Sequence, residues 1–150
     1  MSEPTAQDAD KKQKARKKRI QVGALCLDGQ GRVLLITSRG SGRWVIPKGG
    51  VMRGKSNAEA ALCEAREEAG VEGRIGAVPI GRYRYDKVLR DGRARPVTVQ
   101  VFLAMVDRLA EDWLEAGERT RRWFSPAEAA GLVAEPDLQQ LLRALPEPAG

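Results

Sequence analysis

Hydrophobic positions in the first third of the chain cluster in short β-forming runs. Residues 19–27 and 32–38 are two such runs, and the Asp-Gly-Gln-Gly segment at positions 28–31 between them is typical of a hairpin turn. A glycine-punctuated turn at residues 39–42 leads into a third run, residues 43–46, which ends at Pro47. The pattern predicts a β-hairpin followed by a short strand.

The second half of the chain shows the same β-rich pattern and then changes to helix signals. Three further strands are predicted, at residues 75–85 with an interruption at Pro79, at residues 96–106 with both faces buried, and at residues 121–124. The acidic stretch 107–119 between them is expected to be a loop or short helix. Ser125, followed by Pro126 and by Glu128, is a capping box that starts a helix to about residue 133, and Pro136 starts a last helix to residue 144 with Leu138, Leu141 and Leu142 facing inward.

A longer helix is predicted between Asn57 and Ala69. Ser56 and Glu59 form a capping box at its start, and Gly70 can adopt the left-handed conformation that ends a helix. At 100° per residue the small and apolar side chains fall on one stripe, which lets the helix lie close to a sheet; they are Ala58, Ala61, Leu62, Ala65 and Ala69.

The same helix carries a separate acidic face made of Glu64, Glu67 and Glu68. No lysine or arginine stands three or four residues C-terminal to any of them. The Glu64 and Glu68 pair alone costs an isolated helix roughly 0.2–0.5 kcal/mol. A divalent cation held by the carboxylates would reverse this repulsion, and Mg²⁺ is typically held by one or two carboxylates, waters and substrate phosphates. The alternative is a solvated acidic face with no ligand.

The segment from Gly49 to Val71 resembles the Nudix box, G-x5-E-x7-R-E-U-x-E-E-x-G-U with U an apolar residue. The matching residues are Gly49, Glu64, Ala65, Glu67, Glu68, Gly70 and Val71. Two positions depart from the pattern, because Lys55 replaces its first glutamate and Cys63 replaces its arginine. Both departures concern residues that brace the site in the family, so they place its activity in question.

Membership of the Nudix hydrolases would imply an α+β fold, with a mixed β-sheet flanked by helices over residues 17–145. It would also imply Mg²⁺, or Mn²⁺ in its place, held by the backbone carbonyl of Gly49 and by Glu64, Glu67 and Glu68, the same glutamates being catalytic. The reaction implied is hydrolysis of a phosphoanhydride bond. The resemblance further points to Glu115 or Glu118 as a metal ligand or proton acceptor, and nothing in their spacing selects one.

Basic residues cluster between positions 82 and 95, around the Asp-Gly turn at positions 91–92. Guanidinium groups bind phosphate oxygens in a bidentate manner, so this loop is a candidate for phosphate recognition, and a solvated hairpin tip is the alternative. The residues that we expect to bind substrate are Lys18, Arg43, Lys48, Gly50, Arg82, Arg84 and Arg95.

Composition sets further limits on function. The chain of 150 residues has room for one domain and contains no histidine, which excludes histidine-based acid–base chemistry and histidine-ligated zinc. Of the net charge of +6, a surplus of four lies in residues 1–19. We expect residues 1–16 to be a disordered basic tail and residues 146–150 to fray. We also expect two free cysteines, no membrane span and a cytoplasmic location, and for the basic tail we favour a solubilising or anion-attracting role over nucleic-acid binding.

The region from Glu111 to Phe124 and the run from Gly42 to Gly50 are similar to the diphosphoinositol polyphosphate phosphohydrolase branch of the Nudix family. This similarity implies an anionic, phosphate-rich small molecule as substrate, either a diphosphoinositol polyphosphate or a dinucleoside polyphosphate. Two other functions stay open from the sequence. One is a domain that binds a nucleotide or phosphorylated metabolite without hydrolysis, which Lys55 and Cys63 motivate. The other is an RNA 5′-pyrophosphohydrolase that would use the basic tail. The sequence contains no signal of oligomeric state.

Overall fold

Eight strands form one mixed sheet in the computed structural model, which describes residue 5 and residues 19–147. The expected basic tail, including Lys18, and residues 148–150 lie outside the described residues. The strands are β1 (Ile20–Leu27), β2 (Val33–Thr37), β3 (Trp44–Val45), β4 (Lys48–Gly50), β5 (Val71–Ile75), β6 (Gly81–Val88), β7 (Ala94–Leu109) and β8 (Arg121–Phe124). The helices are α2 (Asn57–Ala69), α3 (Pro126–Leu132) and α4 (Pro136–Arg143).

The centre of the sheet is a parallel pair, β1 and β7, in register from Ile20 with Thr98 to Leu27 with Met105. Antiparallel neighbours lie on both sides of this pair. Strands β4 and β2 pair with β1, whereas β5 and β6 pair with β7. The mixed sheet implied by the family resemblance is therefore confirmed.

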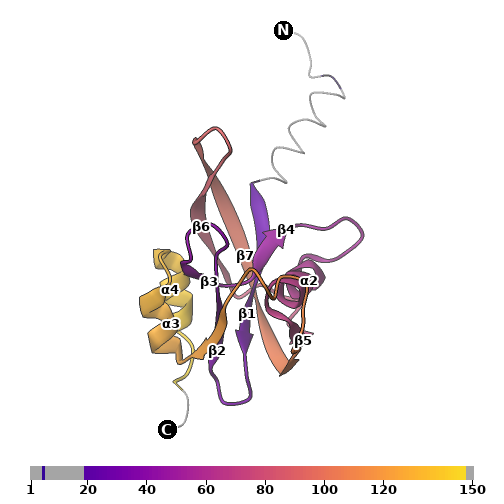
Figure 1. Cartoon of the computed structure of the whole chain (residues 1–150), viewed down its shortest axis with the longest axis vertical. Helices are drawn as coiled ribbons and strands as arrows, with labels where there is room; N and C mark the ends of the chain where they lie inside the picture. Colours follow the sequence, from indigo (N-terminus) through magenta and orange to yellow (C-terminus); the bar gives the residue numbers. More distant parts are fainter. Residues whose placement is uncertain (1–4, 6–18, 148–150) are drawn as a thin grey trace.

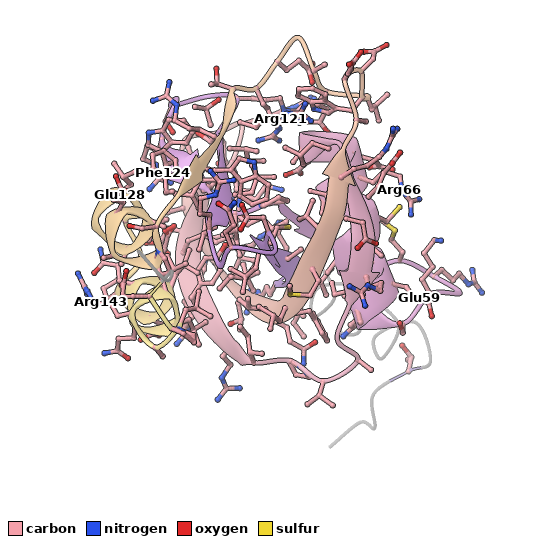
Figure 2. The ribbon with its side chains drawn as sticks, turned by 90° about the horizontal axis from the view of Figure 1, so that it is seen from below. Glu59, Arg66, Arg121, Phe124, Glu128 and Arg143 are labelled. Atoms are coloured by element: carbon pink, nitrogen blue, oxygen red, sulfur yellow. The ribbon has the colours of Figure 1, made fainter. Side chains whose placement is uncertain are left out.

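Helices cover both faces of the sheet (Figure 1). Helix α2 lies on one face, over a hydrophobic cluster that includes its alanines and Phe102. Helices α3 and α4 lie on the other face, over a second cluster that includes Tyr83 and Leu138. Figure 2 shows Glu59 and Arg66 on the outer side of α2, pointing away from the sheet. Burial of the two clusters provides the main driving force for folding.

The local signals at the helix ends are confirmed. The Ser56 hydroxyl accepts a hydrogen bond from the Glu59 N–H at 3.1 Å, and Gly70 adopts φ 68° at the C-terminus of α2. Ser125 and Glu128 form the full reciprocal capping box at the start of α3. In α4, Leu138 and Leu142 are buried as expected and Leu141 packs against the same cluster.

The strand expected at residues 75–85 is interrupted around Pro79 as predicted, but the break is wider than a bulge. The chain instead forms β5 and β6, which lie end to end along β7 and are separated by residues 76–80. The backbone returns to β7 at both sides of this break, through the Gly76 N–H to Leu103 O and the Ile80 N–H to Val101 O hydrogen bonds. Pro79 has no N–H to donate, and Val78 points into solvent with 76% of its surface exposed.

Two other boundaries differ from the expectation. Strand β7 continues to Leu109, so residues 107–109 belong to the sheet and the loop begins at residue 110. Strand β5 begins at Val71, immediately after the helix, and includes a register shift between Glu72 and Gly73. A Cβ atom at Gly73 would lie 2.0 Å from the Met105 carbonyl oxygen, so the strand requires glycine at this irregular position.

Candidate functional site

The acidic face of α2 lies against the edge strand β4. The helix turns its alanines toward the sheet, which leaves Glu64 and Glu68 directed at the backbone of residues 48–50. The contact with Gly49 is especially close, because a Cβ atom there would lie 2.2 Å from the carboxyl carbon of Glu64. Any larger residue at position 49 would force the Glu64 carboxyl group to move away from β4.

Glu68 is the most buried of the three glutamates, with 7% of its surface exposed. Its Oε1 atom accepts a hydrogen bond from the Lys48 backbone N–H at 3.3 Å, and its Oε2 atom lies 3.6 Å from Nη2 of Arg119. The acidic face therefore has a basic ion-pair partner in Arg119, although none is nearby in the sequence. Glu64 forms no ion pair among the described residues.

Arg119 connects the helix to the loop that follows β7. Its side chain is buried and donates to Glu115 Oε1 at 2.8 Å through Nε and to the Thr37 carbonyl at 3.1 Å through Nη1. Glu115 also reaches the helix through its backbone N–H, which donates to the Glu67 carbonyl at 3.1 Å. The loop thus adds a fourth carboxylate beside the acidic face.

Trp113 and Arg121 hold this loop on the C-terminal half of α2. The Trp113 Nε1–H donates to the Glu68 carbonyl at 3.0 Å, and the Arg121 guanidinium lies 3.8 Å from the Trp113 ring centroid. Arg121 also donates to the carbonyls of Ala69 at 2.9 Å and Ala110 at 2.7 Å. Satisfying these carbonyls at a helix end fixes the position of Glu115 relative to Glu68.

Crowding of the carboxyl groups changes their protonation. The pKa of Glu64 is raised from 4.5 to about 7, first by burial and then by the negative charges of Glu68 and Glu67. Burial also raises the pKa of Glu68, although Arg119 and the Lys48 N–H oppose this effect. The repulsion that the sequence predicted along α2 is therefore present in the fold and centred on Glu64.

The donors of this face fit a hard divalent cation held by few protein ligands. No group of three or more histidine, cysteine, aspartate or glutamate side chains in the described ranges is arranged to hold a metal on its own. Mg²⁺ requires less than this, because waters and substrate phosphates complete its coordination. The Glu64 and Glu68 carboxyl groups beside the Gly49 backbone supply the oxygen donors, and a cation there would relieve their repulsion.

The two residues that depart from the Nudix pattern occupy different environments. Lys55 is exposed in the turn before α2. Cys63 is partly buried, and its Sγ atom lies 3.8 Å from Glu67 Oε1, where a weak hydrogen bond holds the Glu67 carboxylate. Cys63 and Cys26 are both free, as expected.

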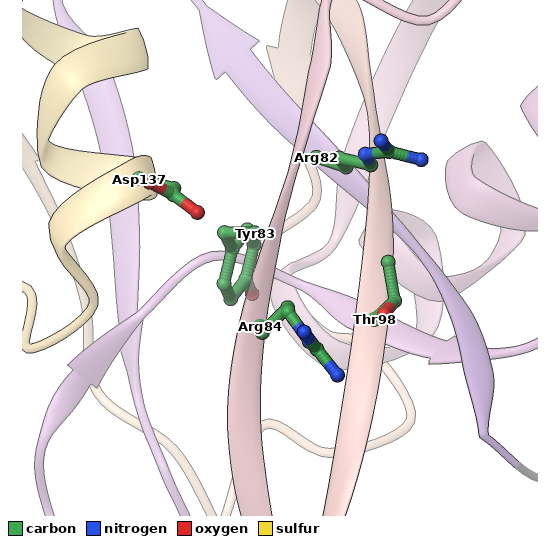
Figure 3. A pocket seen from close by; sticks show the side chains of 5 residues that line it. All are labelled: Arg82, Tyr83, Arg84, Thr98 and Asp137. Atoms are coloured by element: carbon green, nitrogen blue, oxygen red, sulfur yellow. The ribbon is translucent and has the colours of Figure 1, made fainter.

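The predicted substrate-binding residues fall on two faces of the sheet. Arg82 pairs with Gln100 on β7, Gln100 pairs with Val22 on β1, and Val22 pairs with Gly49 on β4. Direct partners in such a row lie on the same face of a sheet, so Arg82 lies on the face that α2 covers. Arg82 and Arg84 extend to one side of β6, and Tyr83 lies on the other side toward Asp137 (Figure 3). The side chains of these residues and Thr98 line a pocket of about 270 Å³.

Lys48 lies on the opposite face, with its ammonium group 4.6 Å from the centroid of the Tyr85 ring. Burial lowers the pKa of Lys48, and the charges of Glu68 and then Glu135 oppose this effect. Arg43 is exposed, and its positive charge also lowers the pKa of Lys48. Gly50 is exposed at the end of β4.

Several residues of the site could not be identified from local sequence patterns. Arg119 was noted only for its branch resemblance, and Glu135 and Tyr85 carried no signal at all. The structure distinguishes the two loop glutamates, because Glu115 adjoins the acidic face whereas Glu118 is exposed and contacts Arg39 at 3.5 Å. These contacts join positions far apart in the chain, so no spacing rule could have revealed them.

A family model and several curated proteins are similar in sequence to this chain. A family model described as NUDIX domain matches residues 17–145. Nudix hydrolase 21, chloroplastic, of Arabidopsis thaliana is 33% identical over 121 residues, which cover 77% of this chain and 57% of that protein. Diphosphoinositol polyphosphate phosphohydrolase 3-alpha of Mus musculus is 33% identical over 114 residues, which cover 73% of this chain and 65% of that protein. The chain thus spans somewhat more than half the length of these curated relatives.

A solved structure supports the fold. The Ap4A hydrolase of C. elegans superposes with a TM-score of 0.60 at 20% identity, covering 83% of this chain and 92% of that one. Within the described part of the chain, no helix has the length and apolar character needed to cross a membrane. The cytoplasmic location stays a prediction.

Proposed function

The chain belongs to the NUDIX family, and from this premise we propose that it is a metal-dependent pyrophosphohydrolase that cleaves a phosphoanhydride bond in a nucleoside or inositol diphosphate-linked substrate. The observation that carries the proposal is the crowding of Glu64 with Glu68 against Gly49. This arrangement raises the pKa of Glu64 to about 7 and has no stabilising role in the absence of a ligand. Perturbed, mutually repelling carboxyl groups are typical of catalytic and metal-binding sites.

In this proposal Glu64, Glu67, Glu68 and the Gly49 carbonyl hold Mg²⁺, for which Mn²⁺ can substitute. The bound cation would neutralise phosphate oxygens and lower the pKa of a water molecule. Arg119 keeps Glu68 in place through the 3.6 Å ion pair, and the Lys48 N–H fixes the other oxygen of the same carboxylate. The protein therefore fixes the orientation of the Glu68 carboxylate, whereas the Glu64 carboxylate can reorient when the cation binds.

We assign the proton-accepting role to Glu115. Its Oε1 atom is held by the Arg119 Nε–H at 2.8 Å, which leaves Oε2 available to take a proton from the attacking water. Proximity to the acidic face favours Glu115 over the exposed Glu118. A fixed carboxylate beside the nucleophile is the arrangement that general base catalysis requires.

Positive charges on both faces of the sheet supply phosphate contacts in this proposal. Lys48 lies on β4 with the charge of Arg43 nearby, and Arg95 lies on β7 on the same face of the sheet as the Lys48 side chain. The pocket beside Arg82 and Arg84 can hold a further phosphate group of a highly anionic substrate. The relatives named as diphosphoinositol polyphosphate phosphohydrolase and Ap4A hydrolase support a substrate with several phosphates.

A hydrolysis panel tests the function directly. The protein is incubated with diadenosine polyphosphates, inositol pyrophosphates, ADP-ribose, nucleoside triphosphates and a 5′-triphosphorylated RNA oligomer, each with Mg²⁺ and with EDTA. The proposal expects metal-dependent release of phosphate or a nucleotide from a diadenosine polyphosphate or an inositol pyrophosphate. Turnover of the RNA alone would assign the RNA 5′-end activity, and binding without any turnover would assign the non-hydrolytic function that Lys55 and Cys63 motivate.

A further inference from the structure

The face covered by α3 and α4 contains a buried carboxyl group, that of Glu135, with one oxygen that has no hydrogen-bond partner among the described residues. Glu135 immediately precedes α4 and has only 7% of its surface exposed. It occupies the N-cap position, where acidic side chains commonly accept a hydrogen bond from the helix, yet its side chain makes no capping bond. Its Oε2 atom accepts no hydrogen bond among the described residues.

Leaving a buried carboxylate oxygen without a partner is unfavourable for folding. In native proteins such an atom calls for an explanation, and a ligand that is absent from the structure is one of them. Glu135 therefore differs from the other acidic residues on the helices α3 and α4, which are exposed.

A second unpaired polar atom lies on the same face. Nε of Arg95 is buried and donates no hydrogen bond in the described part of the chain. Arg95 precedes Val99 and Val101 on β7 by even numbers of residues, so it shares their face, and both valines pack in the cluster that contains Leu138 of α4. A donor and an acceptor are thus buried without partners on one side of the sheet.

Tyr85 connects these two groups with the glutamate face. Its hydroxyl group donates to Gln21 Oε1 at 2.7 Å, and the Lys48 ammonium lies over its ring. Burial raises the pKa of Tyr85, and among the charges that act on this residue Arg95 lowers the pKa and Glu135 raises it. Lys48 also donates its backbone N–H to Glu68, so this residue joins the Tyr85 side of the sheet to the proposed site of hydrolysis.

We propose that Glu135 is a specificity-determining residue whose carboxylate accepts a hydrogen bond from a hydroxyl or amino group on the organic part of the substrate. A carboxylate repels the phosphates of the same molecule, so its partner is a neutral O–H or N–H donor. Lys48 and Arg95 on the same face of the sheet would bind the adjoining phosphates. This inference rests on the proposed function, since it assigns a residue that recognises the organic part of the same substrate.

The test compares ligands that differ only in the organic part. Binding is measured by calorimetry with Mg²⁺, using methylene-bridged analogues of diadenosine tetraphosphate, ADP-ribose and a diphosphoinositol polyphosphate, which resist hydrolysis. Methylenediphosphonate serves as the matched probe without an organic group. The proteins are the wild type, Glu135→Gln, Glu135→Ala and the control Glu111→Gln, which removes the same charge from an exposed position.

We expect both Glu135 variants to weaken binding of at least one organic analogue by about 10- to 100-fold, as for loss of a hydrogen bond to a charged group. Binding of methylenediphosphonate should stay unchanged or tighten, because a repelling charge is removed. The melting temperature should hold or rise, since an unpaired buried carboxylate is lost, and Glu111→Gln should bind every probe as the wild type does.

Three results would overturn the inference. They are equal weakening of organic and inorganic probes, a lower melting temperature in both Glu135 variants, and wild-type binding of the organic analogues no tighter than that of methylenediphosphonate. Hydrolysis of the unmodified compounds by the wild type is measured in parallel. Failure of that reaction would contradict the proposed function and leave the binding comparison intact.

Discussion

Glu64 is the residue at which the fold accepts an electrostatic cost. Its carboxyl group lies against Gly49 and is repelled by Glu68 and Glu67, with no ion pair among the described residues to offset this. The negative charge of Glu64 therefore destabilises the fold, whereas the proposed function requires it for cation binding. The pH dependence of the free energy of unfolding, measured without metal, reports the effect on stability alone.

Replacement of Glu64 by glutamine should stabilise the metal-free protein at alkaline pH. The pKa of Glu64 is about 7 in the fold and 4.5 ordinarily, so the folded state binds the proton more tightly, and stability falls as pH rises from 4.5 to 7. Glutamine does not titrate, so the variant does not lose stability over this pH range. In EDTA the melting temperature of Glu64→Gln should therefore match the wild type near pH 4 and exceed it by a few degrees near pH 8. A difference independent of pH would contradict the assignment.

The two loop glutamates provide a matched comparison of catalysis. Glu115→Gln should lower kcat by about 10²- to 10⁴-fold, because an amide cannot accept the proton from water. Its melting temperature should change little, since the amide oxygen can still accept the 2.8 Å hydrogen bond from Arg119. Glu118→Gln should retain kcat within about twofold of the wild type, because the Glu118 side chain is exposed and forms a surface ion pair with Arg39. Equal losses in both variants would exclude a specific role for Glu115.

At the scale of the secondary-structure elements, the local signals in the sequence predicted most of the fold. The capping residues of α2 and α3, the proline at the start of α4 and the short strand β8 act through neighbours a few residues away, so their positions could be derived from spacing. An interruption at Pro79 was expected, but the full division between β5 and β6 was not. It depends on how both strands pair with distant β7, and the required glycine at position 73 looks like a strand breaker in the sequence.

The C-terminus of α2 provides a test at the scale of one element, because Gly70 ends the helix and lies against the loop that follows β7. Alanine there would have to adopt φ 68°, and its Cβ atom would lie 2.7 Å from Nη1 of Arg121. Gly70→Ala should lower the free energy of unfolding by about 1–2 kcal/mol from the left-handed backbone alone. Gly117→Ala in the same loop has nothing within 4 Å and should be nearly neutral. Denaturant unfolding of both variants measures the difference, and equal stabilities would contradict the account of this helix end.

At the scale of the whole molecule, the site is assembled from distant segments. The acidic face could be predicted from the sequence because its members share one helix. Arg119 could not, because it reaches Glu68 only after the loop that follows β7 has packed against α2, and the burial of Glu135 likewise depends on the packing of distant segments. The basic residues predicted as one group are divided between two faces of the sheet, since alternate positions along β6 and β7 point to opposite sides.

The distribution of positive charge predicts how substrate binding depends on salt. Replacing both Arg82 and Arg84 by glutamine should raise KM for a highly phosphorylated substrate by roughly three- to tenfold at low ionic strength, with kcat unchanged. The increase should shrink at high salt. Arg90 and Arg93 at the tip of the β6 and β7 hairpin provide the control, because replacing both removes the same charge far from the pocket. Equal effects of the two double variants would indicate a general electrostatic contribution.

The central claim is that the carboxylates of α2 bind a metal ion for hydrolysis and do not serve the fold. Glu64→Gln tests it best. Replacement of Glu68 would change the proposed metal site and also remove the ion pair with Arg119. The decisive measurement is the rate of Mg²⁺-dependent phosphate release by Glu64→Gln and by the wild type, with their melting temperatures at neutral pH. The account predicts a rate at least about 100-fold lower at an equal or higher melting temperature. An unchanged rate, or a lower melting temperature that explains the loss, would contradict it.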